Sequence, residues 1–286
     1  MNETQILVEH TIKIASLNLH NNPESYRDRV TAAVREARNS NVDIVLAQEI
    51  ADKDLVVELF KEAGYVHSTL CDAVVSRRNP NAKASTGVFS RIQLAATREL
   101  ALTALPGAKK ASIAVLEFNG YEIHAISAHF AWGADNGSMR LRQAMLISDY
   151  ARRTQEKNSK AVIIVAGTLN DTPYNDSVRY LLGQKSEDGK PSTFWVDATY
   201  DTEVENVNTT RSQNKWGKTA ALHAGVLRPS ALHDQRLDYM FVYGWVYGKP
   251  GMPVEGKLFG VDQTVLNEDI SDHFGIQSLI WLPPTD

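Results

Sequence analysis

The stretch AVIIVAGTLNDTP, residues 161–173, carries the pattern that decides the fold. It begins with a continuous apolar run rich in β-branched residues, which is typical of a strand buried on both faces. Polar Thr168 and Asn170 follow directly, and Pro173 then marks the start of a helix. Since side chains alternate along an extended chain, Thr168 and Asn170 are expected on one side and Leu169 on the other. A buried strand is therefore predicted to end in polar groups.

Similar apolar runs alternate with amphipathic segments along the rest of the chain. The pair Asn119–Gly120 separates two of these runs and is a two-residue hairpin signal. Strands are predicted over 12–19, 42–50, 85–92, 111–118, 121–130, 161–167, near 194–199, over 237–244 and over 274–282. Helices are predicted from the N-cap Asn22 and Pro23 onward, over 53–63, over 138–157, and from Asp171 or Thr172 to about Leu182, with Asp171 as the N-cap.

The order of these elements predicts the fold class. Strands in long antiparallel or mixed runs, with helices between them, are well accommodated by two sheets covered by helices. We therefore expect an α/β fold, a four-layer α/β sandwich of two packed mixed β-sheets flanked by helices, formed by one domain over residues 1–286. The polar region 184–234 is predicted to form long loops, and loops of that length in a compact domain are often functional.

Composition places the chain among soluble globular proteins. Hydrophobic residues make up 43% and charged residues 22%, and no apolar run reaches the ~18 residues of a membrane span. The N-terminal stretch has neither a basic segment nor a small-residue cleavage site, and the one cysteine, Cys71, excludes an intramolecular disulfide. We therefore expect a cytoplasmic monomer. The net charge of −4 gives no support to a dedicated duplex-DNA binder and favours a small or flexible substrate.

Polar side chains recur where the apolar strands end. A strand holds such a side chain rigidly at its exit, and the following loop leaves it open to a ligand. Several exits of this kind in one fold indicate a shared pocket. The residues are Asn18, Gln48 and Glu49, His129, Thr168 and Asn170, Asp238, and Asp272 and His273.

These residue types form a coherent set for phosphate chemistry. Carboxylates and an amide are the oxygen ligands that Mg²⁺ or Mn²⁺ prefers, and two histidines are candidate proton carriers or cationic donors to phosphate. Taken singly, each residue has a simpler interpretation as a turn former, a cap or a solvated loop residue. Ordinary surface or core roles are expected for His20, His124, His223 and His233, and packing for Cys71.

Seven short motifs follow one another over roughly residues 12–282. They are Asn18, QE at 48–49, GVFSR at 87–91, SAH at 127–129, GTLNDTP at 167–173, RLDY at 236–239 and SDH at 271–273. Their order and spacing resemble the endonuclease/exonuclease/phosphatase superfamily. This superfamily includes DNase I, the abasic-site endonucleases, neutral sphingomyelinases and inositol-polyphosphate 5-phosphatases. The resemblance implies the same four-layer sandwich.

The resemblance also implies a role for each matching position. Metal binding is implied at three: Glu49 as the main ligand, with Asn18 and Asp272 completing the metal shell or its waters. Chemical roles are implied at four: His273 contacting the scissile phosphate or acting as a base, Asp238 orienting His273, Asn170 polarising the phosphate, and His129 matching the histidine of the DNase I and sphingomyelinase branches.

One position departs from the family pattern. The pattern is Gly-Asp-x-Asn, and this chain has Gly167, Thr168, Leu169 and Asn170. The family aspartate is thought to activate water, protonate the leaving group or bind metal, and threonine has no useful base strength. Since loss of a general base typically lowers a rate by ~10²–10⁴-fold, Thr168→Asp is expected to raise the rate.

Three functions follow from these patterns. The first is a Mg²⁺- or Mn²⁺-dependent phosphoesterase that hydrolyses phosphodiester bonds as a nuclease, slowed by Thr168. The second is a phosphatase or phosphodiesterase acting on a phospholipid, a phosphoinositide or a nucleotide, with the loops at 184–234 setting that choice. The third is a catalytically inactive binding protein that keeps the pocket. The expected partner is accordingly a nucleic acid or a small phosphate ester.

Overall fold

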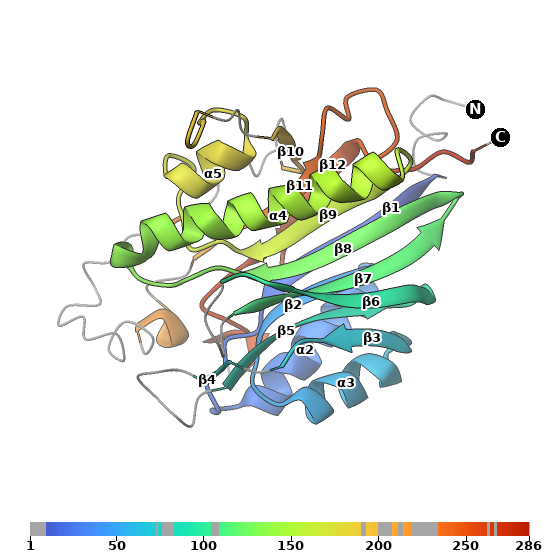
Figure 1. Ribbon diagram of the computed structural model, residues 1–286. Helices are drawn as coiled ribbons and strands as arrows, with labels where there is room; N and C mark the ends of the chain where they lie inside the picture. The colour runs from blue at the N-terminus through green and yellow to red at the C-terminus, as the bar shows by residue number, and fades with distance from the viewer. Residues whose placement is uncertain are drawn as a thin grey trace.

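A computed structural model describes residues 10–72, 74–75, 83–103, 109–189, 193–199, 208–210, 214–218, 234–261, 264–265 and 268–285. Within these residues two β-sheets pack face to face, and helices cover their outer faces (Figure 1). The first sheet is covered by α2 (Tyr26–Asn39) and α3 (Lys53–Glu62), and the second by α4 (Gly137–Lys157) and α5 (Asp176–Leu181). A short 3-10 helix, η1 (Ala134–Asn136), precedes α4. The predicted four-layer α/β sandwich is confirmed.

The strand order is β12-β15-β1-β2-β5-β3 in the first sheet, where β4 also pairs with β5, and β10-β11-β9-β8-β7-β6 in the second. The first sheet contains β1 (Thr11–Asn18), β2 (Ile44–Ile50), β3 (His67–Leu70), β4 (Val74–Val75), β5 (Lys83–Ser90), β12 (Pro253–Phe259) and β15 (Gly275–Trp281). The second contains β6 (Leu94–Ala101), β7 (Lys110–Phe118), β8 (Tyr121–His129), β9 (Val162–Thr168), β10 (Trp195–Asp197) and β11 (Asp238–Tyr243). Strands β13 (Thr264–Val265) and β14 (Glu268–Asp269) form a separate pair.

The strand register brings the polar strand ends to one edge of the sandwich. Strands β1 and β2 are parallel, as are β8 and β9, so each pair ends on the same side. Asn18 lies opposite Gln48, and His129 lies opposite Thr168. Strand β11 runs antiparallel to β9 and begins with Asp238 opposite Thr168. The strand ends that the sequence marked as polar therefore lie close together.

Strand alternation explains why these side chains face each other across the two sheets. Ile14 of β1 and Ala166 of β9 pack in the core between the sheets. The later residues of the same parity, Asn18 and Thr168, therefore point into the same space. Leu169, of opposite parity, packs in the core under α4 and α5, as predicted. The apolar layer between the sheets thus ends in a polar layer at the edge.

Two helix starts differ from the prediction. Helix α2 follows Ser25 rather than Asn22, whose side-chain oxygen accepts a backbone N–H two residues on and forms a turn ahead of the helix. Helix α5 follows Asn175. The predicted N-cap of α5, Asp171, is instead buried against Arg140, with 2.8 Å between Asp171 Oδ1 and Arg140 Nε. A contact between distant segments thus determined the role of Asp171.

The strands that were not predicted are the sheet-edge strands β3, β6 and β12 and the short β4, β13 and β14. The edge strands are partly exposed and lack a continuous apolar run.

The predicted hairpin is confirmed, with φ of 50° at Asn119 and 83° at Gly120. Strand β10 lies within the predicted 194–199, whereas much of 184–234, including His223 and His233, is outside the described residues. No helix in the described part of the chain is both long and apolar enough to cross a membrane.

His124, in β8 beneath α4, is expected to make the protein less stable in mild acid. Its Nδ1 lies 2.7 Å from the Tyr150 hydroxyl, and its Nε2 lies 2.8 Å from Glu122 Oε1. Burial lowers the pKa of His124 below the ordinary 6.5, and Glu122 offsets this only in part. Below pH 6.5 the unfolded chain therefore binds a proton that the folded protein does not. The free energy of unfolding should fall by at most ~1.4 kcal/mol per pH unit from this group.

Urea unfolding at pH 7, 6 and 5 measures this effect in the wild type and in His124→Gln. The variant should show a shallower loss of stability with falling pH, because it lacks the group that the unfolded chain protonates. His67→Gln, which changes a half-exposed histidine on β3, is the matched control and should keep the wild-type slope. Equal slopes in wild type and His124→Gln would contradict the prediction.

Candidate active site

A hydrogen-bonded chain of buried side chains crosses the polar edge between the two sheets. Asn18 Nδ2 donates to Thr168 Oγ1 at 3.2 Å, and Thr168 Oγ1 donates to Asp238 Oδ1 at 2.7 Å. The second oxygen of Asp238 accepts His273 Nδ1–H at 2.7 Å and the Thr209 hydroxyl at 2.6 Å. Both oxygens of Asp238 thus accept hydrogen bonds, and Asp238 fixes the orientation of the His273 ring.

Asp272 and His273, which are adjacent in the chain, form a pair of opposite charges. Burial alone would lower the pKa of His273, but the carboxylates of Asp238 and Asp272 together raise it to about 10. Burial alone would raise the pKa of Asp272, but the neighbouring His20 and His273 hold it well below its usual range. The imidazolium of His273 is therefore held between two carboxylates.

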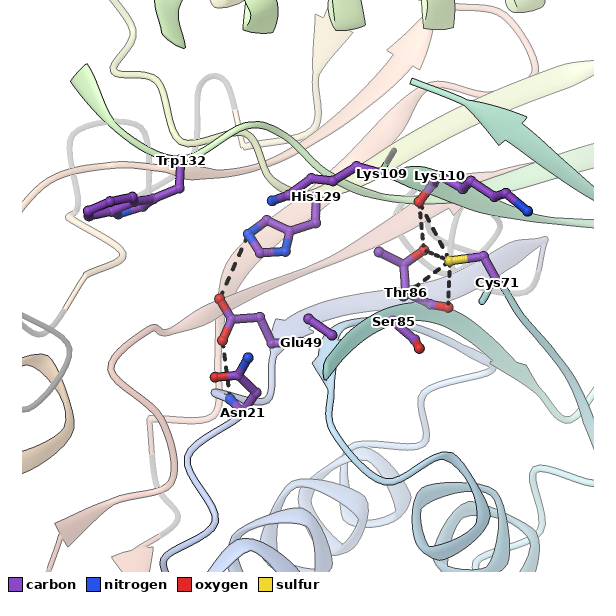
Figure 2. A pocket seen from close by; sticks show the side chains of 10 residues that line it. Asn21, Glu49, Cys71, Ser85, Thr86, Lys109, Lys110, His129 and Trp132 are labelled. Atoms are coloured by element: carbon purple, nitrogen blue, oxygen red, sulfur yellow. Dashed lines mark hydrogen bonds and ion pairs between the residues drawn. The ribbon is translucent and has the colours of Figure 1, made fainter. Parts of the chain in front are cut away.

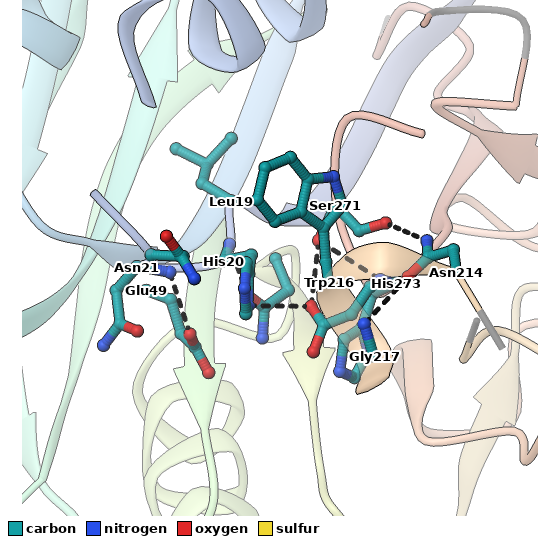
Figure 3. Close-up of polar contacts among 12 residues, drawn as sticks. Leu19, His20, Asn21, Glu49, Asn214, Trp216, Gly217, Ser271 and His273 are labelled. Atoms are coloured by element: carbon teal, nitrogen blue, oxygen red, sulfur yellow. Dashed lines mark hydrogen bonds and ion pairs between the residues drawn. The ribbon is translucent and has the colours of Figure 1, made fainter. Parts of the chain in front are cut away.

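The structure adds His20, for which the sequence had indicated no partner. His20 Nδ1 lies 3.1 Å from Asp272 Oδ1, and the His20 N–H donates to Asn18 Oδ1 at 2.9 Å. The residue is buried and has a left-handed φ of 48°. Figure 3 shows its ring at the edge that also carries Glu49 and His273. His20 therefore connects two of the predicted metal-binding residues, and its position two residues after Asn18 was the only sequence signal.

A buried arginine anchors the loops that carry these residues. Arg29 of α2 is 1% exposed, and its guanidinium lies 4.7 Å from the centre of the Trp216 ring. Each of its side-chain nitrogens donates to backbone carbonyls, which satisfies a charge that burial would otherwise make unfavourable. The acceptors are the carbonyl oxygens of Leu19, His20, Asn22, Glu24 and Ile270.

Glu49 reaches the cleft because the backbone of β2 is irregular at this point. The pairing of β2 with β5 shifts register between Ala47 and Ile50, and Glu49 has a left-handed φ of 55°. Its Oε2 accepts the Asn21 N–H at 3.1 Å, and its Oε1 lies 3.8 Å from His129 Nε2. The side chain of Glu49 is 22% exposed, so its carboxylate is accessible to a ligand.

A cleft of about 220 Å³ lies beside Glu49 and His129 (Figure 2). Lys109 and Trp132 line its upper side, and Trp132 is 53% exposed. Burial, together with the positive charges of Lys109 and His273, lowers the pKa of His129 well below its ordinary value. His129 is therefore neutral at pH 7. Cys71 also lines the cleft and is buried, with its Sγ 3.2 Å from the Thr86 hydroxyl, which agrees with the expected packing role.

Thr168 and Asn170 both depend on the local backbone at the end of β9. Gly167 has a φ of 146°, and a Cβ at this position would lie 1.9 Å from the Ala128 carbonyl oxygen, so only glycine fits. Asn170 has a left-handed φ of 54°, and its Nδ2 donates to the Phe130 carbonyl oxygen at 3.0 Å. The direction of the Asn170 side chain is thus set by this turn, and strand alternation ends at Thr168.

The donor set is compatible with a hard divalent ion. In the described residues no three His, Cys, Asp or Glu side chains are grouped closely enough to hold a metal by themselves. Mg²⁺ does not need such a group, because it keeps several waters and is usually bound through one or two carboxylates. Glu49 is such a carboxylate. Asn18 and Asp272 each have one oxygen engaged by His20, which leaves their remaining lone pairs for a metal or its waters.

Known proteins show the same arrangement of the chain. The model of the Endonuclease/Exonuclease/phosphatase family matches residues 15–273, a range that includes every candidate site residue. Truncated Caenorhabditis elegans TDP2 has a TM-score of 0.69 at 16% identity, covering 95% of this chain and 97% of that one. D. rerio TDP2 complexed with single strand DNA product has a TM-score of 0.68 at 17% identity, covering 94% and 98%. A family protein from Leptotrichia buccalis has a TM-score of 0.63 at 19% identity, covering 94% and 99%. No curated protein matches the chain.

Proposed function

The chain belongs to the endonuclease/exonuclease/phosphatase family, and on this basis we propose that it is a divalent-metal-dependent phosphoesterase that hydrolyses phosphodiester bonds in nucleic acid. One observation carries the proposal: the Asp238–His273 pair, at 2.7 Å, lies at the same polar edge as Glu49, which lines an open cleft (Figure 3). An oriented histidine near a carboxylate able to bind metal suits the hydrolysis of a phosphate ester.

Each candidate residue has a place in this reaction. Glu49 would be the main ligand for Mg²⁺ or Mn²⁺, and Asn18 and Asp272 would complete the metal shell or hold its waters. When bound, such an ion would supply positive charge to the phosphate and lower the pKa of a water it holds. His273, held through Nδ1 by Asp238, presents Nε2 to the scissile phosphate.

Two further residues lie beside this centre. His129 is 3.8 Å from Glu49 and neutral, so it is able to hydrogen bond to a substrate oxygen or a water. Asn170 Nδ2 donates to the Phe130 carbonyl oxygen, and its second amide hydrogen would polarise a phosphate oxygen. Thr168 supplies no proton acceptor of comparable strength, so the reaction is slow in this chain.

Nucleic acid is favoured as the substrate by the aromatic wall of the cleft. Trp132 is 53% exposed beside Glu49 and His129, where a base next to the scissile phosphate is able to stack on the indole. Base–aromatic stacking is a common mode of single-strand binding. The D. rerio TDP2 structure contains a single strand DNA product, and the net charge of −4 favours a flexible strand over a duplex.

A substrate panel tests the proposal and separates it from the alternatives. The panel contains a single-stranded oligonucleotide, plasmid DNA, an abasic duplex, bis(p-nitrophenyl) phosphate, and phosphoinositide vesicles, each with Mg²⁺ and with EDTA. Metal-dependent cleavage of the single strand is the expected result. Turnover of the vesicles alone would favour the phospholipid alternative. Binding of a substrate without turnover in any metal would favour the inactive binding protein, for which neutral Thr168 is the supporting observation.

The metal is expected to depend on Glu49. Millimolar Mg²⁺ or Mn²⁺ should raise the melting temperature of the wild type, because only the native state holds the preformed site. Glu49→Gln should lose this rise, since the amide is a much weaker ligand than the carboxylate. Differential scanning fluorimetry with and without metal measures both. Glu117→Gln, at an exposed carboxylate of β7, is the control and should keep the rise. An unchanged response in Glu49→Gln would place the ion elsewhere.

A further inference from the structure

Lys109 is a cation of the cleft that the motifs did not mark. It directly precedes β7, and its side chain runs along the cleft beside His129, whereas the side chain of Lys110 points in the opposite direction (Figure 2). Lys109 Nζ donates to the Phe130 carbonyl oxygen at 2.6 Å. The same oxygen accepts the Asn170 amide at 3.0 Å. The ammonium group of Lys109 and the amide of Asn170 therefore lie next to each other on a shared acceptor.

The charge of Lys109 is not neutralised by a close carboxylate. Among the described residues no ion pair within 4.0 Å is formed by Lys109, whereas Lys110 Nζ lies 2.5 Å from Glu99 Oε2. Burial lowers the pKa of Lys109 to about 8, an effect that the more distant Glu49 opposes. His129, the other basic group of this wall, is neutral. A partly buried cation of this kind is stabilised by an anion that enters the cleft.

The ammonium group of Lys109 has more N–H donors than its hydrogen bond to Phe130 uses. An ammonium carries three N–H groups, and the Phe130 carbonyl accepts one of them. Lys109 lines the same cleft as Glu49 and His129, so a ligand bound there is able to accept from the remaining donors. A phosphate oxygen bound next to Asn170 would be within their reach and would provide the missing negative charge.

We propose that Lys109 is a substrate-binding residue of this site, whose ammonium donates a charge-assisted hydrogen bond to a non-bridging phosphate oxygen of the substrate. The inference rests on the proposed function for the identity of the substrate, while the phosphate contact itself is testable separately. A purely structural Lys109 would only hold the Phe130 carbonyl. The two roles differ in whether the lysine responds to phosphate and whether its loss acts on substrate affinity.

Kinetics on bis(p-nitrophenyl) phosphate and a single-stranded oligonucleotide test the role in the reaction. Lys109→Met removes the charge but keeps the stem, and it should raise KM by roughly 10- to 100-fold, the loss expected for one charge-assisted hydrogen bond, with a much smaller change in kcat. Lys109→Arg should recover part of the affinity because it restores the cation. Lys110→Met is the matched control and should leave both constants unchanged. An unchanged KM in a folded Lys109→Met protein would overturn the proposal.

A second measurement does not depend on turnover. The lysines of the intact protein are dimethylated with ¹³C-formaldehyde, and the Lys109 signal is identified by its absence from Lys109→Arg. Inorganic phosphate should shift this signal and raise the pKa read from it, while the Lys110 signal stays in place. A Lys109 signal that does not respond to saturating phosphate would overturn the proposal. A response in a protein that cleaves nothing in the panel would support the phosphate contact and contradict the proposed function alone.

Discussion

Asp238→Asn is expected to lower kcat by roughly 10²- to 10⁴-fold, the range seen when the carboxylate that orients a catalytic imidazole is neutralised. Asp238 accepts His273 Nδ1–H at 2.7 Å and the Thr168 hydroxyl at 2.7 Å. An asparagine amide at this position would turn an N–H toward one of these partners and would remove a negative charge beside the imidazolium, so the ring would lose its orientation. Steady-state rates on the substrate panel measure the effect.

Loss of stability must be separated from loss of chemistry in this variant. Asp197→Asn is the matched control, because Asp197 is also a buried aspartate in the second sheet and pairs with Arg236 at 2.6 Å, away from His273. Both variants should lose stability to urea, whereas only Asp238→Asn should lose kcat. A folded Asp238→Asn protein with the wild-type kcat would show that His273 does not need this carboxylate.

Thr168→Asp is expected to raise the metal-dependent rate by at least ~10²-fold, the lower end of the range for a positioned acid or base. Thr168 lies between Asn18 and Asp238, so a carboxylate here would keep the contact with the Asn18 amide. It would also face Asp238 Oδ1 across the present 2.7 Å contact. Two buried carboxylates at this distance repel unless a proton or a metal ion lies between them. The gain should therefore appear only with Mg²⁺ or Mn²⁺ present.

Thr168→Asn separates the effect of charge from that of side-chain shape. Asparagine has nearly the volume of aspartate but no charge, so this variant should not have a higher rate than the wild type. Without metal, Thr168→Asp should be less stable than Thr168→Asn by roughly 2 kcal/mol, because of the repulsion with Asp238, and metal should reduce this difference. Rates with and without EDTA, and urea unfolding of both variants, provide the readouts. A folded Thr168→Asp protein that binds metal but is no faster on any substrate would show that the missing carboxylate is not what limits the rate.

Local sequence patterns predicted much of the fold, because strands and tight turns depend on geometry between residues that are close in the chain. The apolar run that ends in Thr168 predicted β9, and the pair Asn119–Gly120 predicted a hairpin whose residues do have positive φ. Edge strands such as β6 escaped prediction, since a strand exposed to solvent needs no apolar run. The start of α5 was wrong because Asp171 pairs with Arg140 of another helix.

The sequence alone determined which strand ends carry polar groups, since each run and its polar exit lie within about ten residues of the chain. Only the tertiary structure decided how these groups connect. Asn18 and Thr168 are 150 residues apart and meet because both sheets direct the same parity of side chain into one space. His20 and Lys109 joined the site through contacts that the local sequence does not show, because their partners, Asp272 and the Phe130 carbonyl, come from other segments of the chain.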